Sequence, residues 1–199
     1  MEVTTIQGWL DEKEISYNLD LMKNIITHKL WTTDPQCPSS RSMYGLHWQL
    51  LEDKCDLVSE IFGKELAPAY TYARCYPPNE VLKFHNDRKS CEYSLTINLC
   101  NEDNIPWEFF WGTEEREILG SMVMRPGDAV FYEGAKVWHW REPNPSPAVW
   151  QVFLHYVDTN GPYRNWQGEY MRRLPGYVNI LLDKEMDAWK PTVEVADSC

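Results

Sequence analysis

The chain has few basic residues for its length. It carries 19 Lys and Arg against 30 Asp and Glu, which gives a formal net charge of -11 at pH 7. The most basic stretch is the short segment Met171–Arg173. Proteins that bind nucleic acid or anionic membranes neutralise phosphates with clustered Lys and Arg. We therefore expect no nucleic-acid partner and no membrane partner, and the negative field mildly favours neutral or cationic substrates.

Paired cysteines, long apolar runs and a secretory leader are also missing. The six cysteines, at positions 37, 55, 75, 91, 100 and 199, form no C-x-x-C pair. Their spacing therefore fits neither a zinc site nor a small disulfide framework. No stretch approaches the roughly 18 apolar residues of a membrane-spanning helix, and residues 1–11 lack the basic start and apolar core of a signal peptide. These absences predict a cytoplasmic protein with reduced thiols.

Two helices are predicted in the first third of the chain. Apolar residues recur at helical spacing from Ile15 to Leu30 and again from Leu46 to Phe62. Gly63 follows the second run, where a glycine commonly ends a helix. Between the two runs, Thr32–Tyr44 is rich in proline and serine and is predicted to be a loop.

After Gly63 the pattern changes to short extended runs. The predicted strands are Tyr70–Tyr76, Val81–His85, Glu92–Leu99, Trp107–Trp111, Ser121–Met124, Ala129–Tyr132, Val137–Trp140 and Val149–Val157. Helices followed by short strands predict a mainly β fold, an antiparallel barrel or sandwich with a helical buttress. A length of 199 residues fits one domain, with the buttress at about 12–63, the β core at about 65–157 and a C-terminal arm at about 158–199.

Two histidines and one aspartate in the β region form a candidate metal site. His85 and Asp87 are two residues apart at the end of a predicted strand, so their side chains point to the same face. His139 lies in a later predicted strand. Two imidazoles and one carboxylate are the facial ligand set of non-haem Fe(II) oxygenases, which leaves positions open on the metal. The alternative from spacing alone is an ordinary histidine and a turn aspartate.

The residues around this set resemble the prolyl 4-hydroxylase-like branch of the Fe(II)/2-oxoglutarate dioxygenases. Tyr76–Asp87 is similar to the family segment that runs from a strand tyrosine to H-x-D. Met124–Tyr132 resembles its P-x-x-G-D-A-x-x-F strand before the distal histidine. The runs H-x-D-R-x-S-C-E at His85–Glu92 and H-W-R-E-P at His139–Pro143 resemble one of its subgroups. The resemblance covers about residues 65–157.

This resemblance implies a double-stranded β-helix, a jelly-roll barrel. It implies that His85, Asp87 and His139 hold Fe(II), that 2-oxoglutarate chelates the metal as co-substrate, and that O₂ is the oxidant. Tyr76 matches the family tyrosine that hydrogen-bonds the co-substrate; core packing is its other reading. The activity implied is hydroxylation of a prolyl or other peptide side chain, or of a free amino acid or small molecule.

One departure from the family concerns the anchor for the distal carboxylate of 2-oxoglutarate. The family has Lys or Arg about ten residues after the distal histidine, whereas Pro147–Gln151 contains no basic residue. A desolvated carboxylate needs a charged, hydrogen-bonding partner. The candidates are Arg74, Arg88, Arg141 and Lys136, with Gln151 as a neutral donor, and Arg74 is favoured because it shares a strand face with Tyr76.

Other readings of the same residues stay open. Four tryptophans flank the predicted metal strands and are either core residues or a wall that shields the site: Trp107, Trp138, Trp140 and Trp150. His155 is interpreted as a strand histidine that hydrogen-bonds within the core. The alternatives for the whole chain are a β-barrel binding module without catalysis, and a cupin-type metal oxygenase that does not use 2-oxoglutarate.

Overall fold

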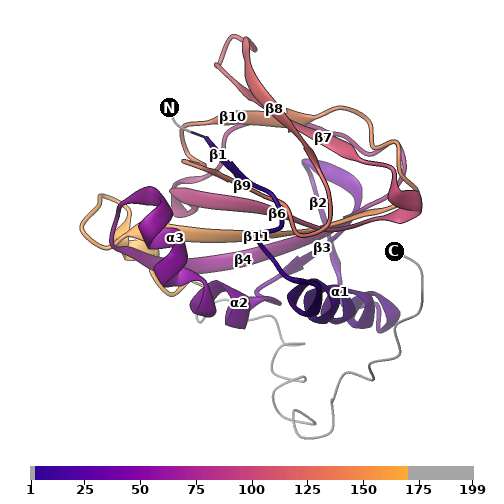
Figure 1. The fold of residues 1–199 in the computed structure, drawn as a ribbon, viewed down its shortest axis with the longest axis horizontal. Helices are drawn as coiled ribbons and strands as arrows, with labels where there is room; N and C mark the ends of the chain where they lie inside the picture. Colours follow the sequence, from indigo (N-terminus) through magenta and orange to yellow (C-terminus); the bar gives the residue numbers. More distant parts are fainter. Residues whose placement is uncertain (1–2, 170–199) are drawn as a thin grey trace, which may run out of the picture.

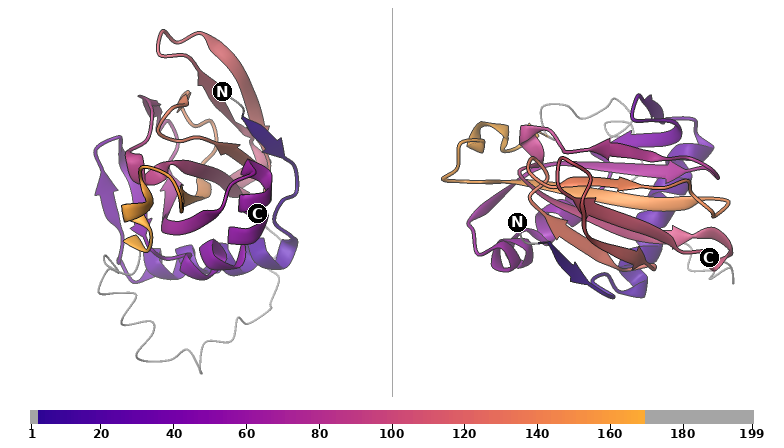
Figure 2. Two further views of the ribbon diagram at one scale, coloured as in Figure 1. Left: turned by 90° about the vertical axis from the view of Figure 1, so that its left-hand side faces the viewer. Right: turned by 90° about the horizontal axis from the view of Figure 1, so that it is seen from above.

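The computed structural model describes residues 3–169. Two antiparallel β-sheets face each other, and three helices cover the outer face of the larger sheet (Figure 1). The larger sheet has the order β1-β9-β6-β11-β4-β3-β2 and the smaller sheet has the order β5-β10-β7-β8. The side view on the left of Figure 2 shows the same layering, with the smaller sheet on the side away from the helices. This architecture confirms the predicted mainly β jelly-roll class with a helical buttress.

The larger sheet lies between the helices and the smaller sheet. Its strands are β1 (Thr4–Ile6), β9 (Ala129–Tyr132), β6 (Tyr93–Asn101), β11 (Val149–Asp158), β4 (Leu66–Tyr76), β3 (Cys37–Tyr44) and β2 (Thr32–Asp34). The smaller sheet consists of β5 (Leu82–His85), β10 (Trp138–Arg141), β7 (Trp107–Gly112) and β8 (Ile118–Met124). Short 3₁₀ turns connect strands at Lys89–Cys91 and Glu102–Asn104, and a third, Arg164–Trp166, follows β11.

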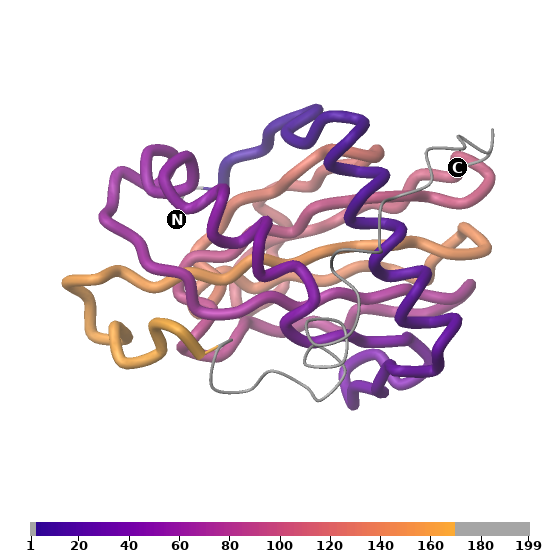
Figure 3. Tube along the Cα trace, turned by 90° about the horizontal axis from the view of Figure 1, so that it is seen from below, coloured from indigo at the N-terminus to yellow at the C-terminus, as the bar shows by residue number. Residues whose placement is uncertain are grey.

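The helices are α1 (Glu12–Thr27), α2 (Trp48–Asp53) and α3 (Cys55–Phe62). They lie across the strands of the larger sheet, as the view from the helical side shows (Figure 3). A capping box starts α1, because Asp11 accepts from the backbone of Glu14 and Glu14 accepts from the backbone of Asp11. Within the described part of the chain, no helix is both long enough and apolar enough to cross a bilayer.

Two sequence expectations about the N-terminal third are wrong. The second helical run is broken at Lys54 into α2 and α3, although Gly63 does end it with a φ of 61°. The predicted loop Thr32–Tyr44 forms β2 and β3, and Arg41–Tyr44 pairs with Tyr72–Cys75 of β4. Pairing with a long neighbouring strand outweighs the turn-like composition of this segment.

The core has two parts, one on each face of the larger sheet. On the outer face, Leu95, Ile97 and Leu154 pack with Met22 and Leu51 of the helices. Between the sheets, a second cluster includes Tyr132, Phe109 and Phe153. The polar residues that alternate along β6 (Ser94, Thr96 and Asn98) are buried and face the barrel interior rather than solvent. The interior of the barrel therefore holds the polar side chains on which a site can be built.

The capping box of α1 generates a stability prediction. Asp11→Ala removes the side chain that accepts from the backbone of Glu14, so we expect the free energy of unfolding to fall by about 1 kcal/mol. Urea denaturation monitored by circular dichroism measures the change. Ser16→Ala, an exposed substitution inside the same helix, is the control and should change stability by less than about 0.5 kcal/mol.

Candidate active site

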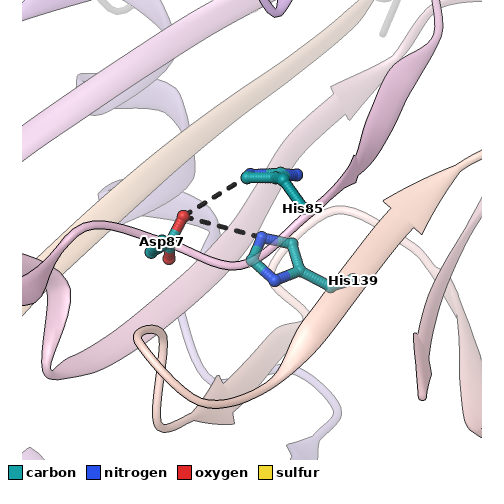
Figure 4. Close-up of side chains that lie close together, drawn as sticks. All are labelled: His85, Asp87 and His139. Carbon is teal, nitrogen blue, oxygen red and sulfur yellow. Dashed lines mark ion pairs between the residues drawn. The ribbon is translucent and has the colours of Figure 1, made fainter. Parts of the chain in front are cut away.

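The three predicted metal ligands meet at one end of the smaller sheet. His85 ends β5, and His139 lies opposite it in the neighbouring antiparallel strand β10. This pairing places the two imidazole rings with their centroids 4.3 Å apart. Asp87 follows two residues after His85, beyond the end of the strand, and turns its carboxylate toward both rings (Figure 4).

The donor atoms of the three residues converge. The Oδ1 atom of Asp87 is 3.5 Å from Nε2 of His85 and 3.7 Å from Nε2 of His139. The Nδ1 atoms of the rings lie 2.7 Å from the carbonyl oxygen of Lys83 and 3.0 Å from that of Val137. The protonated nitrogen of each ring is thus Nδ1, and Nε2 keeps its lone pair for a metal. Ligand bonds of about 2.1 Å put neighbouring donors roughly 3 Å apart, so this set fits one ion after a small contraction.

The protonation states also suit a metal site. Burial raises the pKa of the Asp87 carboxyl, but the charges of His139 and His85 and a hydrogen bond from His85 outweigh burial and lower it to about 2. Burial lowers the pKa of His139 to about 4, although the Asp87 carboxylate acts in the opposite direction. At neutral pH Asp87 is therefore ionised and His139 is neutral, which are the forms that bind a metal.

A glycine in the β9–β10 connection leaves room for Asp87. The backbone N–H of Asp87 donates to the carbonyl oxygen of Gly134 at 2.8 Å, and its Oδ2 lies 3.4 Å from the hydroxyl of Ser94. A Cβ at Gly134 would lie 2.6 Å from Oδ2 of Asp87 and 2.5 Å from Oγ of Ser94, and would also meet the carbonyl oxygen of Cys91. Only a residue without a side chain fits here while the carboxylate keeps its place.

A pocket of about 400 Å³ opens beside the three ligands and extends into the barrel. Its aromatic lining comes mainly from the larger sheet, and consists of Tyr44, Tyr70, Tyr72, Tyr132 and Phe153. The sequence analysis does not predict this aromatic lining. The pattern that indicates it is the alternation along β4, in which Tyr70, Tyr72 and Arg74 point to the same face.

Two of the predicted co-substrate residues, Arg74 and Arg88, line this pocket. The guanidinium of Arg74 is buried, forms an ion pair of 2.9 Å with Asp34, and donates to the hydroxyl of Tyr76 at 3.3 Å. Arg88 lies at the more exposed end, where Nη1 pairs with Glu169 at 2.9 Å and the guanidinium covers the ring of Tyr70.

The other predicted co-substrate residues lie outside the pocket lining. Tyr76 is fully buried behind Arg74 and packs edge to face on Trp107. Gln151 is fully buried and donates to Asn98. Arg141 lies between the rings of Trp107 and Phe109, and its Nη1 donates to the carbonyl oxygen of Trp107 at 2.8 Å. Lys136 is exposed and pairs with Glu133.

None of the four tryptophans considered from the sequence lines the pocket. Trp107 is buried in the core between the sheets, and Trp150 packs in the core beneath the helices. Trp138 and Trp140 lie with Phe84 in an aromatic cluster of the smaller sheet. His155 does line the pocket, where its Nδ1 is 2.9 Å from the Ser94 hydroxyl and its ring stacks on Tyr70.

Comparisons with known proteins point to one group of enzymes by fold. No sequence-family model and no curated protein sequence matches the chain. The solved structure of SnoK, a non-haem alpha-ketoglutarate-dependent carbocyclase from nogalamycin biosynthesis, is 14% identical, with 87% of each chain covered and a TM-score of 0.65. A prolyl 4-hydroxylase from Pseudomonas putida is 11% identical, with 78% of this chain and 92% of that chain covered and a TM-score of 0.62.

A third match is an oxidoreductase of the 2OG-Fe(II) oxygenase family from Burkholderia pseudomallei. It is 12% identical, with 80% of this chain and 86% of that chain covered and a TM-score of 0.63. The chain has the fold of the Fe(II)/2-oxoglutarate oxygenases. This oxygenase fold confirms, at the level of architecture, the family resemblance seen in the sequence.

The space around Gly134 generates a prediction about the site. Gly134→Ala should push the Asp87 carboxylate away from the two histidines, and we expect the affinity for Fe(II) or Mn(II) to fall at least about tenfold, because ligands held out of place weaken a metal site. Isothermal titration calorimetry under anaerobic conditions measures the affinity. Lys136→Ala, an exposed change in the same connection, is the control, and equal affinities in both variants would contradict the role of Gly134.

Proposed function

We propose that this protein is an Fe(II)/2-oxoglutarate-dependent oxygenase that hydroxylates a side chain of a peptide or a small molecule. The observation that carries the proposal is the convergence of His85, Asp87 and His139, in which both Nε2 atoms face the Asp87 carboxylate while the Nδ1 atoms bind backbone carbonyl oxygens. Two imidazoles and one carboxylate are a donor set suited to Fe(II), and they leave open positions for a chelating co-substrate and O₂.

The residues of the chain would have separate tasks. His85, Asp87 and His139 would hold Fe(II), which together with 2-oxoglutarate and O₂ supplies the oxidising power for attack on a C–H bond. Ser94 and the backbone of Gly134 hold the Asp87 carboxylate in place. The aromatic lining keeps water away from the reacting groups and strengthens the electrostatic interactions inside the pocket.

Arg74 is the residue best placed to bind the distal carboxylate of 2-oxoglutarate. It lines the same pocket as the three ligands, and it enters from the barrel interior on β4. Arg88 lies at the more exposed end and Arg141 lies outside the pocket lining. Tyr76 would act indirectly, since its hydroxyl accepts from Arg74 and fixes the guanidinium. A buried guanidinium suits a carboxylate because it offers paired N–H donors.

The size of the pocket limits the substrate. Of the 400 Å³ available, 2-oxoglutarate would take roughly a third, which leaves space for one side chain or one small molecule near the metal. Among the similar structures, a prolyl hydroxylase from Trichoplax adhaerens holds a peptide fragment and the epimerase SnoN holds nogalamycin RO, so the fold accommodates both peptides and small molecules. A prolyl or other peptide side chain, a free amino acid and a small metabolite all fit these dimensions.

The ligand assignment predicts a loss of metal binding without a loss of fold. His85→Ala or Asp87→Ala should abolish Fe(II) binding and release of succinate, while the melting temperature stays within about 4 °C, because neither side chain belongs to the hydrophobic core. Anaerobic titration with Fe(II), an assay of succinate release and differential scanning calorimetry provide the three measurements. His28→Ala removes a histidine outside the site and should leave all three unchanged. Normal turnover in either ligand variant would refute the assignment.

The assignment of Arg74 predicts a specific loss of co-substrate affinity. Arg74→Ala should weaken binding of 2-oxoglutarate to the Fe(II)-loaded protein by about 10- to 100-fold, the loss typical of a charge-assisted hydrogen-bonded pair. The weak visible charge-transfer band of the anaerobic Fe(II) complex reports binding. Arg88→Ala, the same change at the exposed end of the pocket, should weaken binding by less than about threefold. The opposite ranking would make Arg88 the anchor.

A further inference from the structure

The guanidinium of Arg74 is only partly satisfied by the protein. Its Nη1 donates to the hydroxyl of Tyr76 and lies 3.6 Å from Sγ of Cys37. Its Nη2 pairs with a single oxygen of Asp34. Its Nε is buried and has no hydrogen-bond partner among the described residues. Nε and Nη2 form the side-on pair of donors that binds both oxygens of a carboxylate, so Asp34 fills one half of this pair and leaves the other half empty.

Asp34 is held at this position from three directions. Its Oδ2 accepts from the hydroxyl of Tyr72 at 2.9 Å as well as from Arg74, and its Oδ1 accepts from the backbone N–H of Gln36 at 2.8 Å. Partial burial raises the pKa of Asp34, but the charge of Arg74 and these hydrogen bonds outweigh it and hold the pKa below its ordinary value. Asp34 therefore carries a full negative charge beside the cation that the co-substrate needs.

Asp34 lies on β2, a strand that few hydrogen bonds hold to the rest of the sheet. β2 is three residues long, lies at the end of the larger sheet, and among residues 3–169 pairs with β3 alone. Asp34 lines the pocket and its side chain is 21% exposed, so a short path to solvent exists for its carboxylate. Moving a three-residue edge strand breaks few hydrogen bonds compared with moving a central strand such as β11.

We propose that Asp34 is an internal stand-in for the distal carboxylate of the co-substrate, and that a bound dicarboxylate displaces it from Nη2 of Arg74. The inference rests on the proposed function, since it assumes that 2-oxoglutarate is the ligand of Arg74. The incoming carboxylate completes the side-on pair by accepting from both Nε and Nη2. Asp34 turns toward solvent at the edge of the sheet and keeps its bond to the Gln36 backbone.

Two consequences follow from this exchange. In the free protein, Asp34 neutralises a buried cation that would otherwise be costly to desolvate. In the complex, it sets the selectivity of the pocket, because a ligand must carry a terminal carboxylate to replace the ion pair that it breaks. A 2-oxo acid of the same length without that carboxylate gains nothing at Arg74 and leaves Asp34 in place.

Asp34→Asn tests the exchange. The substitution keeps the shape of the side chain and an oxygen for the Gln36 N–H, but it removes the competing charge. We expect the dissociation constant of 2-oxoglutarate for the anaerobic Fe(II)-loaded protein, measured by calorimetry, to fall by about tenfold, the scale of a single partly exposed charge pair. The dissociation constant of 2-oxopentanoate, which lacks the distal carboxylate, should change by less than about twofold. Asp53→Asn, an exposed change of the same net charge on α2, is the control.

The outcomes separate the inference from the proposed function. Weaker binding of 2-oxoglutarate by Asp34→Asn would show that Asp34 positions Arg74, and unchanged binding would show that the two do not compete; either result overturns the inference. No binding of 2-oxoglutarate by the unaltered Fe(II)-loaded protein would overturn the proposed function itself. If Asp34→Asn does not fold, Tyr72→Phe carries the test, because it releases one bond that holds Asp34 and leaves every charge in place. It should then tighten binding of 2-oxoglutarate, but not of 2-oxopentanoate, by about threefold.

Discussion

The register between β5 and β10 is the constraint on which the site depends. Because His85 and His139 are directly opposed, both imidazoles reach one point inside the barrel, and a shift by one residue would turn one of them to the outer face. Phe84 stacks on Trp138 at 4.8 Å and also contacts Trp140. As neighbours of the two histidines along their strands, these rings point to the opposite face. Their packing fixes the register that the inner face needs.

The inner face of the larger sheet provides the second requirement, a row of polar groups between the two sheets. Burying such groups is costly unless each finds a partner. Ser94 lies between Asp87 and His155, Thr96 lies within hydrogen-bonding distance of Tyr132, and Asn98 accepts from Gln151. The side chains that surround the candidate metal centre are therefore held by one another before any ligand binds. Such preorganisation is what keeps a catalytic group in position.

Some of this could be predicted from the sequence and some could not. The two-residue spacing of His85 and Asp87 is local, and His139 was identified from the family resemblance and its motif. Of the two readings of the tryptophans, packing is the one the structure bears out, and strand alternation gives the reason for two of them, since Trp138 and Trp140 flank His139 and face the other way. The β2–β3 hairpin was missed because its pairing with β4 is a tertiary contact. The pairing of Asp34 with Arg74 joins residues 40 positions apart, and no spacing rule indicates it.

For binding of the co-substrate, the charges of the Asp34–Arg74 pair inside the pocket have a larger effect than the net charge of the chain. Surface charges beyond about 8–10 Å are screened by salt, so the pocket depends on its own residues. Arg74 with Asp34, and Arg88 with Glu169, are each neutral as pairs. Asp87 leaves a divalent metal with one positive charge, and a dianionic co-substrate would make the whole pocket negative in a setting of low dielectric. Release of Asp34 to solvent would return the balance to neutral, so the edge strand that carries Asp34 is the part of the barrel that should respond to the co-substrate.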